Sequence, residues 1–506
     1  MPFPLDVAIR QHAITRADRR AVKFAAQDMS YSQFNRYIDH LAQVLNQLGI
    51  THGDTVATLL PNGLDALGLY FAVTRIGAVV VPLSALLKDD AVINLADNAA
   101  CKLIICETPR HSSLLKHRSS LSNVSLPHGL ITNTHLHDML ERTEHNPVAP
   151  VAVATSDSFN IVYSSGTTGS PKGIVHSQHT RTMYGYCFSS ALKIHASSVV
   201  LHSGSIVFNG AFVTMLPTFL TGASYVLMPA FNPVSTINTI ADEQVTHTML
   251  VPSQLIALLE SPAFCADKLA SLEVVLVLGA PLLQIYKDLI EQHLPGRLHE
   301  LYGLTEGVIT ILDNSDYATK SASVGCAIAG AKIRIVDEAG DDLPAGDIGE
   351  IVGNGPLLMQ GYHGQADLTA ATYKQGWMYT GDMGYLDTDG FLYLADRKKD
   401  MIISGGINVY PKDIEELIAQ HHNTVECAVF GVPSKKWGET PVAVVITRDK
   451  DQFNAAELLS WINTRVSASY QKVSAVHQLS ELPRNLAGKT LKNQLRGQFS
   501  NDSKQK

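Results

Sequence analysis

The sequence predicts an α/β fold with a large N-terminal domain of α/β subdomains, which includes a β-rich subdomain, and a small α+β C-terminal domain. Three observations predict it. The chain of 506 residues is too long for one hydrophobic core. Helical and strand patterns alternate as far as about residue 307, as they do in a parallel sheet. Beyond residue 323, short strand patterns with Asp- and Gly-rich turns take over, and a separate α/β segment follows the charged residues 396–400.

The first elements show the α/β rhythm clearly. Ser30 and Gln33 have the spacing of a capping box at the start of a helix, and Gly49 is a typical helix stop. Buried strands are predicted at 56–60 and 78–81, on either side of a helix at 64–76. This order predicts a β-α-β unit with parallel strands.

Two later stretches depart from this rhythm. Between 111 and 150 the pattern weakens, which predicts a mostly surface-exposed stretch between subdomains. From 194 to 241 there is no Asp, Glu, Lys or Arg, but turn residues such as Gly204 and Gly222 interrupt the apolar residues. A membrane-spanning helix needs about 20 consecutive, mainly apolar residues, so a buried strand–helix–strand unit is the better interpretation.

The β-rich part is predicted from two hairpins. Strands at 332–336 and 348–352 flank a turn at 337–340, and a second pair flanks the turn Asp387-Thr388-Asp389-Gly390. Turn chemistry accounts for these Asp residues, because no complete calcium-binding loop is present. Farther on, a helix starting at Pro411 and strands at 425–432 and 442–447 are expected.

Composition excludes several function classes. The formal net charge is −8 and Lys and Arg form no long runs, which argues against nucleic acid as a partner. Six cysteines without a C-x-x-C pair are typical of a reducing compartment, so we expect a cytoplasmic protein. No signal peptide and no integral membrane segment are expected. The sequence leaves open whether the chain forms a homodimer.

A Ser-, Thr- and Gly-rich loop after the apolar strand 159–162 is the strongest single motif. Backbone N–H groups that converge at a Gly-rich turn, together with hydroxyl groups and a lysine, are suited to hold a polyphosphate. The loop is not a Walker A motif, because Ser170 and Pro171 separate the last glycine from the lysine. Its alternative interpretation is a flexible Ser/Gly loop. The residues concerned are Ser164, Ser165, Gly166, Thr167, Thr168, Gly169 and Lys172.

With this loop the chain resembles the adenylate-forming superfamily of acyl-CoA synthetases, aryl-CoA ligases, peptide-synthetase adenylation domains and firefly luciferase. It is most similar to an acyl- or aryl-CoA ligase. The resemblance spans nearly the whole chain, because further motifs occur in the family order. They are Tyr302-Gly303-Leu304-Thr305-Glu306, Tyr379-Thr380-Gly381-Asp382, Asp396-Arg397-Lys398-Lys399-Asp400 and Pro483-Arg484-Asn485-Leu486-Ala487-Gly488-Lys489.

The resemblance implies an ATP site. Tyr302 would stack on adenine, next to Gly303 and a turn formed by Gly279, Ala280 and Pro281, where Leu278 replaces a family glycine. Asp382 and Arg397 would contact the ribose. Thr305 would contact phosphate and Glu306 would help to hold Mg²⁺, which fits the preference of a hard cation for carboxylate and phosphate oxygens.

The resemblance also implies a mobile C-terminal domain with a catalytic lysine. The N-terminal domain would comprise residues 1–398, with the β-rich subdomain at about 323–395, and the mobile domain residues 399–506, with the hinge at Lys399. Lys489 would catalyse adenylation. Because carboxylate and α-phosphate are both negative, an ammonium group that bridges them suits this step.

Sites for CoA and for the acid follow from family positions. Gly405 and Gly406 would line the thiol tunnel, and Trp437, Tyr470 and Lys472 would contact the CoA nucleotide, although a packed Trp and a surface Lys are the structural alternative. The acyl pocket would be largely apolar with one amide, which favours an aromatic or medium-chain acid. Its candidate residues are Tyr184, Phe208, Asn209, Gly210, Met249, Leu278, Gly303, Val308 and Ile309.

The sequence thus predicts an ATP-dependent carboxylic acid:CoA ligase that forms acyl-AMP and then acyl-CoA, AMP and pyrophosphate. Its cofactors would be ATP, Mg²⁺ and coenzyme A, and its partners a small carboxylic acid, ATP and CoA. Two alternatives stay open: an acyl-AMP ligase that loads a carrier-protein thiol, and a non-catalytic nucleotide-binding relative. Luciferase-type oxygenation would need a special substrate.

Overall fold

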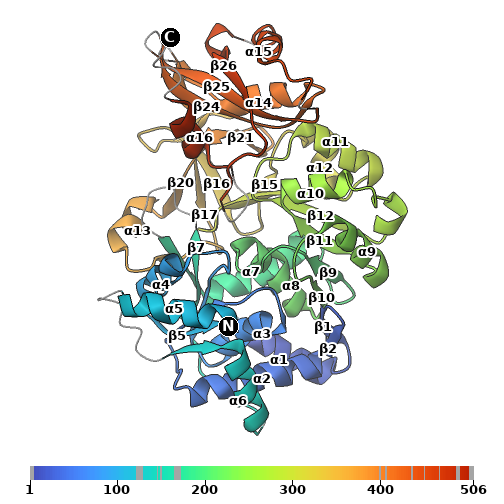
Figure 1. The fold of residues 1–506 in the computed structure, drawn as a ribbon, viewed down its shortest axis with the longest axis vertical. Helices are drawn as coiled ribbons and strands as arrows, with labels where there is room; N and C mark the ends of the chain where they lie inside the picture. Colours follow the sequence, from blue (N-terminus) through green and yellow to red (C-terminus); the bar gives the residue numbers. More distant parts are fainter. Residues whose placement is uncertain are drawn as a thin grey trace.

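The computed structural model describes residues 5–120, 129–144, 146–148, 151–164, 172–397, 400–404, 407–434, 437–449, 451–466, 468–485 and 490–500, with the side chains of 117–120, 164 and 396–397 left out. A large N-terminal part carries a small C-terminal part at one end (Figure 1). The expected fold class, an α/β protein with a large N-terminal and a small C-terminal domain, is confirmed.

A nine-stranded sheet forms one half of the large domain. Its central strands are parallel, as predicted, and antiparallel strands flank them at both edges. In spatial order the strands are β2 (Gln27–Ser30), β1 (Arg20–Phe24), β10 (Ser224–Leu227), β9 (Val199–His202), β11 (His247–Leu250), β12 (Val274–Leu278), β13 (Leu298–Gly303), β14 (Ile309–Leu312) and β15 (Cys326–Ala327).

A seven-stranded sheet forms the other half. The predicted β-α-β unit is confirmed in it, since β3 and β4 pair in parallel. In spatial order the strands are β6 (Leu130–Thr132), β5 (Cys101–Cys106), β3 (Thr55–Leu59), β4 (Val79–Pro82), β7 (Ser158–Ser164), β8 (Lys172–Ser177) and β18 (Gly361–Tyr362).

Most described residues of the stretch 111–150 are exposed or half-buried, as predicted, but the stretch does not simply connect two subdomains. It contains an edge strand, β6, and part of helix α5 (Thr108–Ser120), followed by α6 (Asn133–Arg142), whose Leu136 and Leu140 are buried. A three-residue strand is too short to show a period, and helix α6 buries only one face, so the sequence pattern did not reveal these elements. The stretch therefore belongs to the seven-stranded sheet and its covering helices.

Helices cover both sheets and fill the space between them. Helices α2, α3, α7 and α8 share one hydrophobic cluster with strands of both sheets, whereas α9, α10 and α11 cover the outer face of the nine-stranded sheet and α4 and α5 that of the other. The remaining bounds are α1 (Leu5–Thr15), α2 (Tyr31–Gln47), α3 (Leu64–Arg75), α4 (Asp89–Asn98), α7 (Gln178–Ala191), α8 (Asn209–Thr221), α9 (Pro233–Glu243), α10 (Pro252–Leu259), η1 (Ala266–Leu269), α11 (Gln284–His293) and α12 (Asn314–Lys320).

Local signals in this domain are confirmed. Ser30 and Gln33 form the capping box of α2, and Gly49 follows the helix with a positive φ. The uncharged stretch forms the buried unit β9–α8–β10. Among the described residues, no helix is long and apolar enough to cross a membrane.

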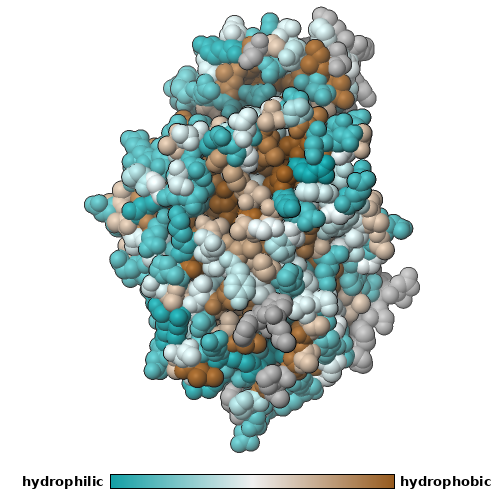
Figure 2. Space-filling view, turned by 180° about the vertical axis from the view of Figure 1, so that it is seen from behind, coloured by the Kyte–Doolittle hydropathy of each residue, from teal (hydrophilic) through white to brown (hydrophobic). Residues whose placement is uncertain are grey.

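On the face seen in Figure 2, hydrophobic side chains gather in the middle and upper part, whereas the edges are mostly hydrophilic.

The β-rich subdomain contains both predicted hairpins. Strands β16 and β17 pair antiparallel, and so do β20 and β21. Asp337 and Asp387 accept hydrogen bonds from the backbone N–H groups of their own turns, so these acidic residues shape turns, as expected. The elements are β16 (Lys332–Val336), β17 (Gly349–Asn354), α13 (Ala366–Thr372), β19 (Tyr373–Lys374), β20 (Trp377–Leu386) and β21 (Leu392–Arg397).

The C-terminal part has a five-stranded sheet and its own two hydrophobic clusters. The predicted helix at Pro411 and both predicted strands are confirmed. Its elements are β22 (Ile402–Ser404), β23 (Ile407–Val409), α14 (Pro411–Ala419), β24 (Thr424–Ser434), β25 (Gly438–Thr447), α15 (Ala455–Asn463), η2 (Ser469–Gln471), β26 (Ala475–Gln478) and α16 (Lys492–Phe499). The exact domain boundary stays a prediction, and the proposed hinge Lys399 lies outside the described residues.

A buried arginine ties the first three helices together. Arg75 of α3 is fully buried and forms ion pairs with Asp6 of α1 (Nε–Oδ1, 2.6 Å) and Asp39 of α2 (Nη1–Oδ1, 2.9 Å). It also donates to the side chain of Asn35 at 2.8 Å. Removing one partner of a buried ion pair leaves the others as poorly compensated charges, which is far more costly than losing an exposed pair.

We therefore predict that Arg75→Met lowers the free energy of unfolding by about 3–5 kcal/mol, measured by chemical denaturation. Arg334→Met is the matched control, because Arg334 pairs with Asp342 at the surface, where side chains are 30% and 67% exposed. That change should cost about 1 kcal/mol or less. Equal small effects of the two substitutions would contradict the role given to Arg75.

Candidate active site

Tyr302 and Asp382 connect two of the predicted motifs. Tyr302 lies near the end of β13 and Asp382 in the middle of β20, on different sheets. The Tyr302 hydroxyl donates a hydrogen bond to Asp382 Oδ2 at 2.8 Å, and the ring packs against the hydrophobic cluster of the β-rich subdomain. Asp382 is 8% exposed, and its backbone N–H is bound by the Thr380 hydroxyl at 3.0 Å. Two motifs 80 residues apart therefore meet at one point.

A cavity of about 320 Å³ opens beside this hydrogen bond, between the large and the small domain. The large domain lines it with Tyr302 and Asp382 and with further predicted residues, namely Gly279, Ala280, Pro281 and Gly303. Gly279 has a φ of +99°, which a side chain would strain, so the tight turn after β12 needs a glycine. The turn expected near adenine thus does border the same cavity as Tyr302.

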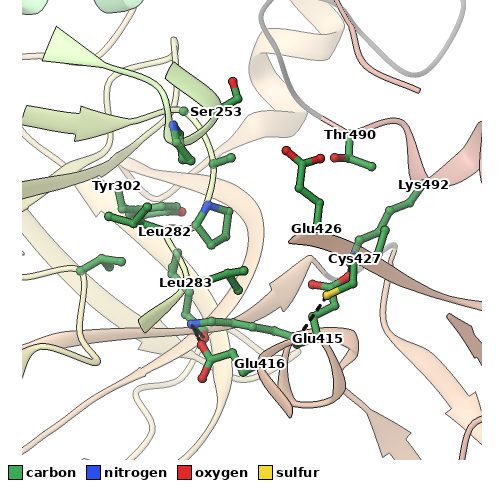
Figure 3. A pocket seen from close by; sticks show the side chains of 18 of the residues that line it. Ser253, Leu282, Leu283, Tyr302, Glu415, Glu416, Glu426, Cys427, Thr490 and Lys492 are labelled. Atoms are coloured by element: carbon green, nitrogen blue, oxygen red, sulfur yellow. Dashed lines mark hydrogen bonds and ion pairs between the residues drawn. The ribbon is translucent and has the colours of Figure 1, made fainter. Parts of the chain in front are cut away.

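The opposite wall of the cavity comes from the small domain. Figure 3 shows Tyr302, Ser253 and Leu282 on one side and Glu426, Cys427 and Lys492 on the other. Lys492 forms an ion pair with Glu415 (Nζ–Oε1, 2.7 Å), which also lines the cavity. Sequence reasoning missed these residues, because nothing in a local pattern tells which face of the small domain meets the large one.

The flanks of the C-terminal motif also reach the cavity. Arg484 and Thr490 form an isolated β-bridge and both line the cavity. Lys489 lies outside the described residues. The same holds for Ser165, Gly166, Thr167, Thr168, Gly169, Gly405 and Gly406, and the side chains of Ser164 and Arg397 are not described. The Arg397 backbone pairs with that of Asp382 across β20 and β21.

Glu306 and Lys172 both contact Tyr362, a residue that the sequence analysis did not single out. Tyr362 of β18 donates to Glu306 Oε1 at 2.9 Å, and the Lys172 ammonium lies 5.4 Å from the centroid of the Tyr362 ring. Burial, and then the charge of Glu306, raise the pKa of the Tyr362 hydroxyl, so it stays a donor. Tyr362 therefore fixes the orientation of this carboxylate.

A buried histidine holds the backbone next to Glu306. His176 of β8 is fully buried and its Nε2 lies 2.8 Å from the carbonyl oxygen of Thr305. Burial and the nearby Arg181 keep its pKa well below the usual value, so the ring is neutral. Because a carbonyl only accepts, Nε2 carries the proton and Nδ1 accepts from Arg181 at 3.2 Å. No sequence motif indicated a role for His176 or for Arg181.

No described cluster competes with Glu306 as a metal site. Within the part of the chain that the structure describes, no three His, Cys, Asp or Glu side chains gather as metal ligands. A single carboxylate suits Mg²⁺ only if phosphate oxygens and water complete its shell. The residues therefore fit a metal that arrives with a nucleotide.

The acyl-pocket candidates come together in part. A side chain at Gly210 would touch Leu278 (3.2 Å) and Met249 (3.5 Å), so these three adjoin. Asn209 lies 3.4 Å from the Tyr184 hydroxyl, and Phe208 is the partly buried N-cap residue of α8. Val308 instead packs against Gly353 of β17, and Ile309 is buried on β14. Val308 thus contacts the β-rich subdomain.

The candidate CoA residues lie away from the cavity lining. Trp437 is 47% exposed in the β24–β25 turn, and Tyr470 is 37% exposed in η2. Lys472 is exposed at the end of η2. The large exposed rings do not form part of a core, which argues against the alternative of a packed Trp.

Comparisons with known proteins agree with this arrangement. A family model described as AMP-binding enzyme matches residues 9–363, and one described as AMP-binding enzyme C-terminal domain matches residues 413–489. The chain is 33% identical to a feruloyl-CoA synthase of Amycolatopsis sp over 488 residues, covering 95% of this chain and 96% of that protein. It is 31% identical to an indoleacetate–CoA ligase of Aromatoleum aromaticum over 499 residues, covering 96% of both.

A solved structure also matches the domain arrangement. ATP-bound MatB from Rhodopseudomonas palustris is similar with a TM-score of 0.92 at 27% identity, over 99% of this chain and 100% of that chain. Apo MatB has the same identity and coverage, but a TM-score of 0.81. The relatives from Amycolatopsis and Aromatoleum are a CoA synthase and a CoA ligase. The two family models match the two halves of the chain in order, so the chain belongs to the AMP-binding enzyme family.

Proposed function

We propose that this protein is an ATP-dependent carboxylic acid:CoA ligase, which forms acyl-AMP and then acyl-CoA, AMP and pyrophosphate. One observation carries the proposal. Tyr302, Asp382 and the Gly279 turn form one wall of a cavity whose other wall, with Thr490, comes from the mobile-domain candidate. A site shared between two domains suits a reaction in two steps that need different groups.

In this proposal the nucleotide lies along the large-domain wall. Adenine would stack near Tyr302 and the turn formed by Gly279, and the ribose hydroxyls would donate to Asp382, whose carboxylate can accept several hydrogen bonds. Arg397, opposite Asp382 on the next strand, would add a contact to the ribose. The phosphates would extend toward Lys172 and the loop 164–169.

The first step needs positive charge. A carboxylate oxygen attacks the α-phosphorus, the new C–O–P bond forms, and pyrophosphate leaves with the electrons of the broken P–O bond. Both reactants are anionic, so Lys172 and the proposed catalytic Lys489 would offset their repulsion in a site that excludes water. Thr490, the residue that follows Lys489 in the sequence, lines the cavity.

Glu306 is the proposed Mg²⁺ ligand. The metal would supply charge neutralisation at the phosphates. Tyr362 would keep the Glu306 carboxylate turned toward the phosphate side, and His176 would hold the Thr305 backbone beside it. Thr305 itself would contact phosphate.

In the second step the CoA thiolate attacks the acyl carbon and AMP leaves. Gly405 and Gly406 would line the thiol tunnel after the C-terminal domain has turned about Lys399. The exposed rings of Trp437 and Tyr470, with Lys472, support a nucleotide-binding surface, since aromatic faces and a cation suit a CoA nucleotide.

The acid is proposed to be aromatic or of medium chain length. The named relatives act on feruloyl and indoleacetate groups, and the adjoining Met249, Leu278 and Gly210 provide an apolar surface. Tyr184, Phe208, Asn209 and Val308 remain pocket candidates. A cytoplasmic location, which the six free cysteines support, and a homodimer also remain predictions.

ATP–pyrophosphate exchange with a panel of aryl, fatty and amino acids tests the function. We expect exchange with aryl or medium-chain acids, and thioester and AMP when CoA is added. Exchange without thioester would instead favour a carrier-protein thiol as acceptor. The absence of exchange with every acid, together with tight binding of an acyl-AMP analogue, would favour the non-catalytic alternative.

Lys489→Ala should lower the rate of adenylation by about 10²-fold or more, because the positive charge at the attacking oxygen is lost. Thioester formation from preformed acyl-AMP should be affected much less. Single-turnover measurements of the two steps check this. An equal loss in both steps would remove Lys489 from the adenylation step.

Tyr362→Phe should raise the Mg²⁺ concentration needed for half-maximal exchange by about tenfold, because Glu306 loses the hydrogen bond that orients it. Tyr373→Phe is the control, since the Tyr373 hydroxyl binds the Met359 carbonyl at 3.0 Å instead of a carboxylate. The Mg²⁺ dependence of that variant should stay near the wild-type one. An unchanged Mg²⁺ dependence in Tyr362→Phe would show that the tyrosine does not position Glu306.

A further inference from the structure

Arg181 of helix α7 is a fully buried cation bound only to neutral groups among the described residues. Its Nε donates to Asn160 Oδ1 at 3.2 Å, and its Nη2 donates to His176 Nδ1 at 3.2 Å and to Asn209 Oδ1 at 2.8 Å. None of these described interactions is with a carboxylate. A buried charge is costly unless it is compensated, so this arrangement needs an explanation.

The surroundings keep the guanidinium charged. It lies 4.7 Å from the centroid of the Tyr184 ring and 4.3 Å from that of Phe212, and both aromatic faces attract a cation. Burial lowers the pKa of Arg181 only to about 10, so the positive charge remains at neutral pH. Its Nη1 is buried and has no hydrogen-bond partner among the described residues.

Arg181 determines which way the Asn209 side chain faces. A guanidinium only donates, so Asn209 must turn its oxygen toward Arg181 and its amino group away from it. The amide Nδ2 lies 3.4 Å from the Tyr184 hydroxyl, which uses at most one of its two hydrogens. Asn209 therefore presents an N–H donor that is polarised by a buried positive charge.

The position of Asn209 strengthens this donor. Asn209 is the first residue of α8, and the N-cap residue Phe208 provides no side-chain hydrogen bond. A helix N-terminus carries partial positive charge, which adds to that of Arg181. The side chain of Asn209 is partly exposed, and the next residue, Gly210, adjoins Leu278 and Met249. The donor thus lies at the edge of the apolar pocket candidates.

We propose that Asn209, oriented by Arg181, is a specificity-determining residue that selects acids with an oxygen acceptor on their non-reacting part. A hydroxyl, ether or carboxylate oxygen would accept the hydrogen bond of Nδ2, whereas an ammonium group would be repelled. The proposal rests on the proposed ligase function and narrows its substrate class. It also accounts for a polar residue in an otherwise apolar pocket.

Matched pairs of acids test the proposal in the adenylation assay. One set is phenylpropanoic acid and its three ring-methoxylated isomers, and the other is octanoic acid and its terminally methoxylated derivative, because an ether oxygen accepts a hydrogen bond but cannot donate one. We expect the full-length wild-type enzyme to favour at least one oxygenated acid over its parent by about tenfold or more in kcat/KM, the effect of one strong hydrogen bond. Asn209→Asp should reduce this ratio to one or below, because carboxylate oxygens only accept.

Asn160→Asp is the matched control. It also places a carboxylate on Arg181, at Nε, but leaves the Asn209 amide in place. This variant should retain most of the preference. An equal loss in both variants would assign the preference to charge alone and overturn the role of Asn209.

Two further outcomes separate this inference from the function. If all acids support exchange with equal kcat/KM, the inference is wrong and the ligase function stands. If no acid supports exchange in the wild-type enzyme, the proposed function fails and the inference fails with it. Thermal unfolding of each variant checks that altered ratios are not due to unfolded protein.

Discussion

The hydrogen bond from Tyr302 to Asp382 is the contact on which the candidate site depends. It joins the last parallel strand of the nine-stranded sheet to the central strand of the β-rich subdomain. Asp382 is buried at its end of the bond, where the lower dielectric strengthens a hydrogen bond. It fixes one wall of the cavity, and the turn at Gly279 borders the same space. Without it, the two subdomains would present their motifs separately.

Polar contacts between described residues join the small domain to the large one beside this cavity. Lys412 donates to the Leu394 carbonyl at 3.1 Å, and Arg448 lies 3.6 Å from Glu260 at the exposed edge. Exposed ion pairs contribute little to stability, so the pair of Arg448 and Glu260 adds little to holding the two domains together. The TM-score is 0.92 with ATP-bound MatB and 0.81 with apo MatB, so the structure is more similar to the ATP-bound arrangement of MatB.

Charge is distributed unevenly around the site. Lys172 and Glu306 both contact Tyr362. Arg181 instead donates to Asn209 and has no carboxylate partner among the described residues. His176 links the two regions, because it contacts Arg181 on one side and the Thr305 carbonyl on the other. A neutral histidine can do this since one nitrogen accepts while the other donates. The phosphate-binding and acyl-binding candidates therefore share one buried polar network.

The sequence by itself determined the fold class, the first β-α-β unit, the hairpins, several strands of the C-terminal part and the order of the motifs. These features depend on local patterns, such as the capping box of Ser30 and Gln33, which a single segment fully contains. Only the tertiary structure decided that Tyr362 orients Glu306, that Arg181 faces Asn209, and that 130–132 is a sheet strand. Such contacts depend on how distant segments pack. A local sequence pattern does not tell which residue a helix residue such as Arg181 will contact.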